Sequence, residues 1–229
     1  MTYRAVMVGA TGAVGGALLR HLLASTECAG VVAITRRPVN LGESPKLRTE
    51  VADFASLESA TERLAASCDQ AFCTVGVGQP RKVSREEFWR VDVEYAGAFA
   101  RGARAAGARH ISLLSAVGTN AASRNFYVRV KGAAEEAVAK AGVPRTSLFR
   151  PSLLVTDQLR YGLQDRVTQA VFPLVAPFLP ARFHHIHVDD LARAMQLNAE
   201  RPGPAGVAVL HYQDFMALLR QVRPGVSEG

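Results

Sequence analysis

Apolar residues follow two spacings along this chain. Short apolar runs are typical of strands, and they fall at 3–8, 31–35, 47–51, 69–74, 110–114 and 146–149. Apolar residues that recur every three or four positions are typical of helices, and such segments fall at 14–24, 56–66, 84–106 and 123–141. Strands and helices therefore follow one another in regular succession. Units of this length predict an α/β fold with a doubly wound parallel sheet.

Capping signals locate the ends of two of these helices. Ser84 and Glu87 have the spacing of a capping box and predict the start of the helix over 84–106. Gly142 follows the helix over 123–141 and predicts its end. A loop over 76–83 is expected before Ser84, because it contains Gly78 and Pro80.

The last third of the chain is less regular. Residues 155–187 carry aromatic residues and prolines without a clear period. Asp189 or Asp190 is then expected to cap a helix that ends near Glu200. A strand over 207–212 and a helix over 214–222 complete the pattern. We expect a single domain over 1–229, in which 152–187 and 203–229 form the small substrate-side and C-terminal elements.

A glycine-rich turn joins the first strand to the first helix. It comprises Gly9, Ala10, Thr11, Gly12, Ala13, Val14 and Gly15. A dinucleotide's pyrophosphate needs backbone amides and a helix N-terminus without obstructing side chains. Gly9 would allow the tight turn, Gly12 the close approach of phosphate, and Gly15 the packing of helix on strand. The turn therefore predicts a Rossmann-type dinucleotide cradle; an ordinary strand-to-helix turn is the competing interpretation.

Residues after the second, third and fourth strands indicate the type of dinucleotide. Arg36 and Arg37 end the second strand, where a carboxylate would bind a ribose 2′-hydroxyl and a guanidinium would bind a 2′-phosphate. This favours NADP(H) over NAD(H), although two solvated arginines are an alternative. Asp53 could bond the adenine amino group or act as a turn or helix cap. Thr74, Val75 and Gly76, at the end of the fourth strand, could contact the cofactor or be a plain strand exit.

A second cluster suggests carbonyl chemistry. Ser115 ends the fifth strand, and Tyr127 and Lys131 lie one turn apart on a predicted helix. Reduction of a carbonyl needs a proton donor, and a free phenol has a pKa of about 10. A neighbouring ammonium and the positive nicotinamide would lower that pKa. Ser115 could hold the carbonyl oxygen as charge develops. A surface pair on a helix is the alternative interpretation of Tyr127 and Lys131.

These motifs resemble those of a known family. The glycine turn, Ser115, Tyr127 and Lys131 combine with two further segments, Phe149-Arg150-Pro151-Ser152 and His187-Val188-Asp189-Asp190-Leu191-Ala192. Together they are similar to the atypical short-chain dehydrogenase/reductase superfamily, and within it to the Tat-interacting oxidoreductase-like group. The resemblance covers nearly the whole chain. It implies one Rossmann-type domain that binds NADP(H), with Pro151 near the cofactor and Ser115, Tyr127 and Lys131 as catalytic groups.

The chain departs from the family pattern at one position. Family members often carry an asparagine in the long helix before the fifth strand, where it supports the lysine and a proton-relay water. This chain has Asp92 there, in Val91-Asp92-Val93-Glu94. A carboxylate could pair with Lys131 or organise water, and it could also mean weak turnover or none.

Three function classes remain open at this point. The first interpretation is an NADPH-dependent reductase of a small carbonyl compound. The second is a non-catalytic NADP(H)-binding regulator that senses redox state and binds a protein partner, and the third is an epimerase that uses the same cofactor without net oxidation. No motif in the sequence identifies the substrate.

Composition limits the binding partners and the cellular location that can be expected. The net charge is +7, but the arginines are scattered along the chain, which argues against nucleic acid as a partner. Cys28, Cys68 and Cys73 lack metal-site or redox spacing and are expected to be buried free thiols. No metal site is expected from the three histidines at 184, 185 and 187. With no signal peptide and no membrane segment evident, we expect a soluble cytoplasmic protein, and a homodimer remains open.

Overall fold

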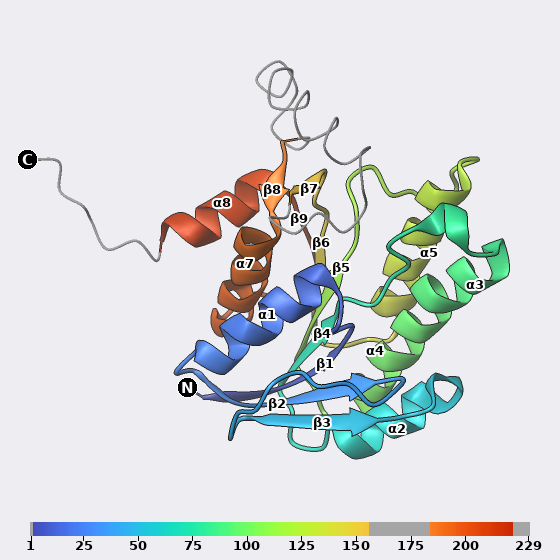
Figure 1. Ribbon diagram of the computed structural model, residues 1–229. Coiled ribbons are helices and arrows are strands. Elements are labelled where there is room, and N and C mark those ends of the chain that lie inside the picture. The colour runs from blue at the N-terminus through green and yellow to red at the C-terminus, as the bar shows by residue number, and fades with distance from the viewer. Residues whose placement is uncertain (1, 156–183, 222–229) are drawn as a thin grey trace, which may run out of the picture.

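The computed structural model describes residues 2–155 and 184–221, and its centre is a parallel sheet of seven strands. In spatial order the strands are β3 (Leu47–Val51), β2 (Cys28–Thr35), β1 (Tyr3–Val8), β4 (Gln70–Cys73), β5 (His110–Leu114), β6 (Arg145–Phe149) and β9 (Gly206–Leu210). Every neighbouring pair in this sheet is parallel (Figure 1). The predicted doubly wound sheet is confirmed.

Helices cover both faces of the sheet. One face carries α1 (Ala13–Ala24), α7 (Val188–Glu200) and α8 (Tyr212–Arg220), and the other carries α2 (Leu57–Leu64), α4 (Tyr95–Ala105) and α5 (Phe126–Lys140). A short α3 (Arg85–Trp89) precedes α4, and a small parallel sheet pairs β7 (Leu154–Val155) with β8 (Ile186–His187). The sequence pattern did not predict this small sheet, because each of its strands has only two residues.

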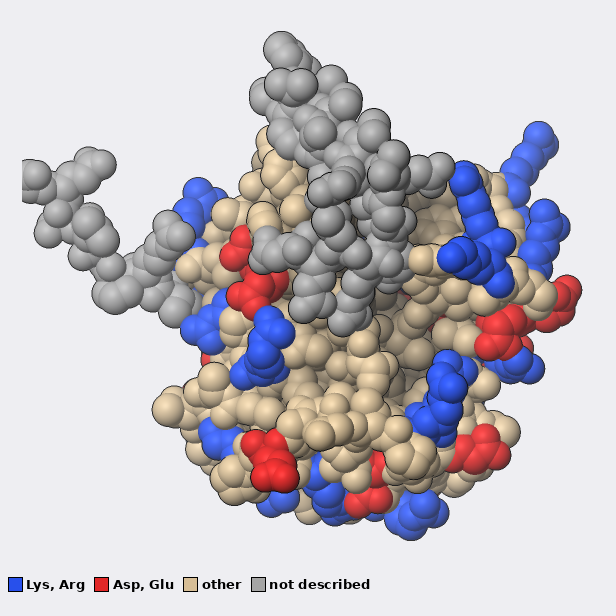
Figure 2. Space-filling view, viewed as in Figure 1, with Lys and Arg blue, Asp and Glu red and all other residues tan. Residues whose placement is uncertain are grey.

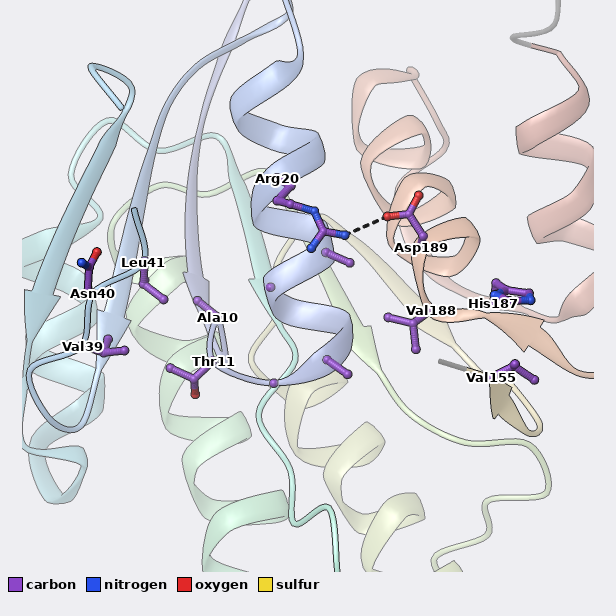
Figure 3. Close-up of a pocket in the computed structure, with 14 residues that line it drawn as sticks. Ala10, Thr11, Arg20, Val39, Asn40, Leu41, Val155, His187, Val188 and Asp189 are labelled. Carbon is purple, nitrogen blue, oxygen red and sulfur yellow. Dashed lines mark hydrogen bonds and ion pairs between the residues drawn. The ribbon is translucent and has the colours of Figure 1, made fainter. Parts of the chain in front are cut away.

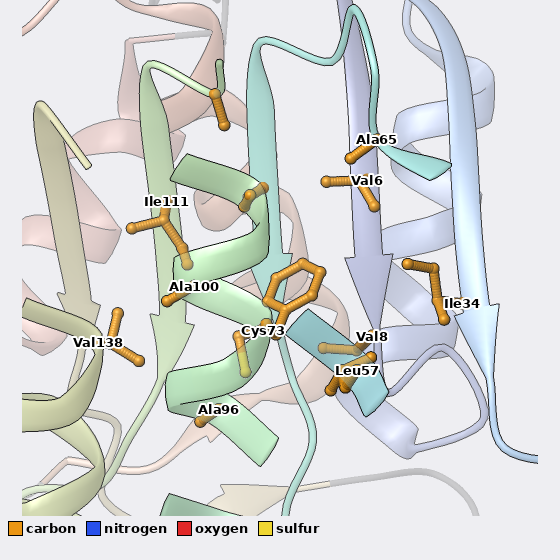
Figure 4. Close-up of a cluster of buried hydrophobic side chains, with 14 of the residues drawn as sticks. Val6, Val8, Ile34, Leu57, Ala65, Cys73, Ala96, Ala100, Ile111 and Val138 are labelled. Carbon is orange, nitrogen blue, oxygen red and sulfur yellow. The ribbon is translucent and has the colours of Figure 1, made fainter. Parts of the chain in front are cut away.

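Two apolar clusters hold the layers together. Alternate residues of β1 separate them: Val6 and Val8 face α2 and α4, and Ala5 and Met7 face α1 and α7. Figure 4 shows the first cluster, in which Ala96 and Ala100 of α4 lie against the sheet. Strands that bury both faces must carry apolar residues throughout, which is why these strands read as continuous apolar runs.

The strand order fixes where a ligand can bind. From β1 the chain proceeds outward to β2 and β3, and it then returns to place β4 on the other side of β1. The connections on the two sides of this point leave in opposite directions, which opens a crevice beyond the carboxyl ends of β1 and β4. The glycine turn follows β1 directly and therefore lies at this crevice.

The long helix predicted over 84–106 is present as one helical segment, but it is not a regular α-helix throughout. It consists of α3, a π-helical turn at Arg90–Glu94, and α4. Ser84 caps α3 as predicted, since its side chain accepts from the Glu87 amide at 3.0 Å. A π turn holds one more residue than an α turn and is frequent at functional sites. Here it contains Asp92.

Three predicted helix boundaries need correction. The helix predicted over 123–141 begins at Phe126, because Asn125 rather than Ser123 caps it by accepting from the Val128 amide. Neither Asp189 nor Asp190 caps α7, since the cap is His187 and both aspartates lie in the first turn. The last helix starts at Tyr212 rather than Asp214.

Asp214 instead completes the cap of α8. Its carboxylate accepts from the backbone N–H of His211 at 2.8 Å. Most of the predicted substrate-side element at 152–187, and the end of the element at 203–229, lie outside the described residues.

The three cysteines are free and buried, as expected. Burial raises the pKa of the Cys68 thiol to about 11 and that of Cys73 to about 12. These thiols therefore stay protonated and unreactive at neutral pH. Among the described residues, no helix is long and apolar enough to cross a membrane.

A buried polar network crosses the sheet at the end away from the glycine turn. The His110 ring lies 2.7 Å from Gln70 Oε1 and 2.9 Å from Ser147 Oγ, and Asn198 also donates to Ser147. Burial and the charge of Arg145 lower the pKa of His110 to about 3. His110 is therefore neutral in the folded protein at neutral pH. In mildly acidic solution it gains a proton only when the protein unfolds.

This arrangement makes stability depend on pH. An unfolded histidine titrates near pH 6.5, so folding is favoured above that pH and loses stability as pH falls toward 3. We expect His110 to account for a loss of about 2 kcal/mol between pH 7 and pH 5. Urea unfolding at several pH values would measure it, with His110→Gln as the comparison. Equal pH slopes in the two proteins would show that His110 does not carry this dependence.

Candidate functional site

The glycine turn brings α1 unusually close to the sheet. Gly9 has a φ of +88°, and a Cβ there would lie 2.5 Å from the carbonyl carbon of Thr74. A Cβ on Gly15 would lie 2.1 Å from the Gly9 carbonyl oxygen. Both positions therefore exclude any side chain, which is the role that the sequence predicted for them.

Gly12 has a different role. It precedes α1 with ordinary extended dihedrals, φ −75° and ψ 166°, and its amide donates to Gly9 at 3.0 Å. No side chain caps α1, and its first turn contains no acidic residue. The first amides of the helix and its positive dipole end are thus free to receive an anion. These residues fit the pyrophosphate of a dinucleotide.

A cavity of about 410 Å³ lies beside this turn. Its lining comes from three places: the turn and one side of α1, the loop after β2, and the region where β8 leads into α7 (Figure 3). Arg20 of α1 lies on one side and donates to Asp189 at 3.0 Å. Asn40 and Leu41 lie on the opposite side. Sequence reasoning missed Arg20, Asn40 and Leu41, because they belong to no motif.

Arg36, Arg37 and Asp53, which were predicted to contact the adenosine half of the cofactor, do not line this cavity. Arg36 and Arg37 are exposed, and the Arg36 guanidinium lies 6.0 Å from the centre of the Phe54 ring. Asp53 caps the short helical turn that follows β3, since its carboxylate accepts from the Ala55 amide at 2.9 Å. Of the two roles expected for Asp53, the structure contains the cap.

The exit of β4 has two distinct parts. The Thr74 hydroxyl donates to the Val8 carbonyl at 2.9 Å, so Thr74 ties β4 to β1. Gly76 is exposed, and a Cβ there would lie 3.2 Å from Asp92 and 3.4 Å from the Lys131 ammonium. Val75 lies between them and is partly buried. The strand exit therefore leads directly to Lys131.

Lys131 forms a buried ion pair with Asp92. The distance from Nζ to Oδ1 is 2.6 Å, and the other carboxylate oxygen accepts from the Val77 amide at 2.8 Å. Burial of the ammonium opposes its charge, but Asp92 and Tyr127 outweigh this and leave the pKa of Lys131 raised. Lys131 is therefore charged and fixed, and its charge is already balanced by a carboxylate.

Tyr127 lies one turn before Lys131 on α5. Its side chain is 42% exposed, and its ring packs against Phe88 of α3 with centroids 5.9 Å apart. Tyr127 is therefore partly open to solvent, while the side chain of Lys131 one turn away is mostly buried. The exposure of Tyr127 suits the general acid that the sequence predicted, since such a group must reach a substrate. The burial of Lys131 suits a group that holds a fixed charge.

Ser115 is bonded in a way that the sequence did not predict. Its hydroxyl donates to Glu135 at 2.5 Å, and Thr119 and Arg150 bond the same buried carboxylate. Arg150 Nη2 also reaches the second oxygen at 2.5 Å, which raises the pKa of Arg150. Glu135 continues the row of Tyr127 and Lys131 by one further turn, and that spacing was the available signal.

Pro151 lies close to this cluster and is buried. Its carbonyl accepts from the Val117 amide at 2.8 Å, so it joins the exit of β6 to the exit of β5. The structure therefore assembles the glycine turn, Gly76, Lys131 and Ser115 at the carboxyl ends of neighbouring strands.

Comparisons with known proteins agree with this arrangement. A family profile described as NAD(P)H-binding matches residues 9–171. Protein HTATIP2 of Rattus norvegicus is 29% identical over 214 residues, which span 93% of this chain and 87% of the rat protein. Protein FMP52 of Candida albicans, named as mitochondrial, is 28% identical over 168 residues, which span 72% of this chain and 73% of that protein.

Two solved structures show the same fold. The enzyme WbmG of Bordetella bronchiseptica, solved in complex with NAD, has a TM-score of 0.68 and 16% identity, over 99% of this chain and 83% of that one. The oxidoreductase ylbE of Lactococcus lactis has a TM-score of 0.67 and 16% identity, over 97% of this chain and 99% of that one. At these identities the likeness concerns the fold alone.

The two kinds of glycine in the turn should respond differently to substitution. Gly12→Val should fold, because its dihedrals suit any residue and its Cβ would meet only the Gly9 oxygen at 3.3 Å, yet the branched side chain would occupy the phosphate position. Gly9→Ala should lose stability by several kcal/mol, because its Cβ would overlap the Thr74 backbone. Calorimetric titration with NADPH and urea unfolding would separate the effects. Unchanged NADPH affinity in folded Gly12→Val would mean that the turn binds no phosphate.

Proposed function

Because the chain belongs to the NAD(P)H-binding family, we propose that it is an NADP(H)-dependent oxidoreductase that reduces a small carbonyl compound. The observation that carries this proposal is the row on α5: an accessible Tyr127 one turn from a buried, charged Lys131, beside the exit of β4. The cradle at the N-terminus of α1 supports the cofactor half of the proposal. Tyr127 and Lys131 support the other half, the reduction of a carbonyl.

Each part of the cofactor would have its own set of residues. The amides of Ala13 and Val14, exposed by Gly12, would hold the pyrophosphate, and Thr11 lies on the same turn. Arg36 and Arg37 would receive the 2′-phosphate. Residues at the strand exits, from Thr74 to Gly76 and at Pro151, would border the nicotinamide half. When bound, the reduced nicotinamide supplies the hydride.

Tyr127 would act as the general acid. Its exposed hydroxyl can approach a carbonyl oxygen, and its ring is held by Phe88. Lys131 would hold the nicotinamide ribose and provide positive charge near the phenol. Because Asp92 neutralises much of that charge, the acid in this chain has less electrostatic support than an unpaired lysine would give it.

Ser115 would position the substrate rather than supply a proton. Its only hydroxyl proton is directed to Glu135, which also accepts two hydrogen bonds from Arg150. The oxygen of Ser115 therefore offers lone pairs to the site. It can accept from an O–H or N–H group of a substrate or of a neighbouring side chain.

One observation favours a second function. The Lys131–Asp92 pair also has a structural role that requires no reaction, because its two charges neutralise each other. Asp92 accepts from the Val77 amide and thereby holds the exit of β4 in place. A protein that only senses NADP(H) and passes the signal to a partner needs the cradle and this brace but no general acid. Retention of Tyr127 with an accessible hydroxyl favours the enzyme.

Other expectations from the sequence remain predictions. They are one nucleotide-binding domain over 1–229, a small-molecule substrate without nucleic acid as a partner, a possible homodimer and a cytoplasmic location. The last is in tension with the fungal relatives that are named mitochondrial. Fractionation of the source cells would decide the location.

The preference for NADP(H) can be tested at the two arginines. Arg36→Ala with Arg37→Ala should weaken NADPH binding by about 10- to 100-fold, as expected for loss of charge-assisted hydrogen bonds, and should leave NADH binding nearly unchanged. Arg63→Ala with Arg104→Ala removes two exposed charges far from the turn and serves as the control. Equal dissociation constants for the two cofactors in the unmodified protein would contradict the preference.

The enzyme and the sensor differ in their response to one hydroxyl. Tyr127→Phe should leave NADPH affinity nearly unchanged and lower turnover of any carbonyl substrate by about 10²- to 10⁴-fold. Tyr3→Phe, which removes a hydroxyl at the opposite end of β1, is the matched control. The assay is NADPH consumption over a panel of aldehydes, ketones and quinones. If the unmodified protein binds NADPH but turns over none of the panel faster than Tyr127→Phe, the sensor is favoured.

A further inference from the structure

Basic residues that are scattered in the sequence gather beside Tyr127 in the fold. They belong to the turn after β4, the start of α3, and the start of α5 with the loop before it. We call them the cationic rim: Arg81, Lys82, Arg85, Arg124 and Arg129. Figure 2 shows Lys and Arg side chains gathered over α3 and the start of α5.

An aromatic side chain holds two of these cations in place. The Arg85 guanidinium lies 5.2 Å from the centre of the Phe126 ring, and that of Arg129 lies 5.4 Å from it. Arg129 also donates to the Ser123 carbonyl at 2.7 Å. Phe88 contacts both Phe126 and Tyr127, with centroids 5.9 Å apart in each case. The two guanidinium groups are therefore fixed next to the proposed general acid.

The rim is connected to the site through the loop after β4. This loop leaves Gly76 beside Lys131, and its Val77 amide is bonded to Asp92. It then turns at Pro80–Lys82 and enters α3. Three of the rim cations, Arg81, Lys82 and Arg85, thus lie within ten residues of the strand exit that borders Lys131.

None of the rim cations forms an ion pair with a carboxylate of the described residues. Six other arginines of the described residues do form such pairs, namely Arg20, Arg48, Arg90, Arg101, Arg109 and Arg150. Glu87, one of the two carboxylates nearest in sequence, pairs with Arg90. The other, Glu86, is bonded to its own backbone and to Ser84, which lower its pKa, and it is attracted to Arg85 without an ion pair.

We propose that the cationic rim selects an anionic substrate, a small aldehyde or ketone that also carries a carboxylate or phosphate. Fixed guanidinium groups bind such oxyanions with two parallel hydrogen bonds. Like charges that gather without ion pairs also raise the local concentration of anions and attract them to the site. The proposal rests on the proposed function, because it names the substrate class of the same site.

The test uses two probes that differ in one charge. They are benzaldehyde with a para-carboxylate and the methyl ester of the same compound. Reduction of each is measured at several salt concentrations with saturating NADPH, and binding of each to the NADPH-loaded protein is measured by calorimetry. The rim variant is Arg81→Gln with Arg85→Gln and Arg129→Gln, which includes both guanidinium groups held by Phe126. The control variant removes the same charge at three helix ends: Arg63→Gln, Arg104→Gln and Arg220→Gln.

We expect the carboxylate probe to be favoured by about tenfold in kcat/KM and in affinity at low salt. The preference should fall as salt rises, and it should disappear in the rim variant but not in the control. Equal kcat/KM and equal affinity for the two probes would overturn the proposal. A preference for the carboxylate that the rim variant retains would also overturn it. An oligonucleotide that displaces the carboxylate probe at lower concentration would also overturn it, because the rim would then serve nucleic acid.

The two readouts separate this proposal from the proposed function. If neither probe is reduced but the carboxylate binds about tenfold more tightly through the rim, the anion preference stands and the reductase loses support. If both probes are reduced equally at every salt concentration, the reductase stands and the rim proposal fails.

Discussion

The close approach of α1 to the crevice between β1 and β4 is the constraint on which the rest of the site depends. Gly9 and Gly15 leave no space for a side chain, and the Thr74 hydroxyl holds the end of β4 to the end of β1. With the three segments pressed together, the positive end of α1 points over the strand ends. A side chain of even one carbon at either glycine would move α1 outward and would widen the crevice that must grip a phosphate.

How much of the structure the sequence predicted depends on how far apart in the chain the interacting residues lie. Parallel strands buried on both faces must be apolar throughout, so β1, β2 and β5 were visible as runs. Gly9 and Gly15 were visible as one motif because they stand within seven residues, although the Thr74 atoms that close both positions come from the end of β4. Glu135 and the lining around Asn40 were not, because their partners arrive from distant segments after folding. Boundary errors at α5 and α7 arose because several residues in each start could cap.

The fold uses its charges in two different ways. Inside the site, Lys131 and Arg150 each have a buried carboxylate that fixes their position and balances their charge. A buried pair of this kind contributes geometry more than net stability, since desolvation opposes the attraction. Around Phe126 the cations are held by a ring and by backbone carbonyls instead, which leaves their charge uncompensated. Scattered arginines in a sequence can therefore form one field in the folded protein.

The π turn at Arg90–Glu94 has a consequence for how this lineage can change. A π turn takes up one more residue than an α turn within a single revolution, so α3 and α4 keep nearly the rotational phase of one regular helix. Loss of one residue there would restore regular α-helical winding and would leave Arg85 and Phe88 on the side of Phe126 and Tyr127. Loss of one residue from the regular part of α4 would instead turn α3 by about 100° and would remove both side chains from that side. The π turn is therefore the one place between α3 and α4 at which a single codon deletion would preserve this wall of the site.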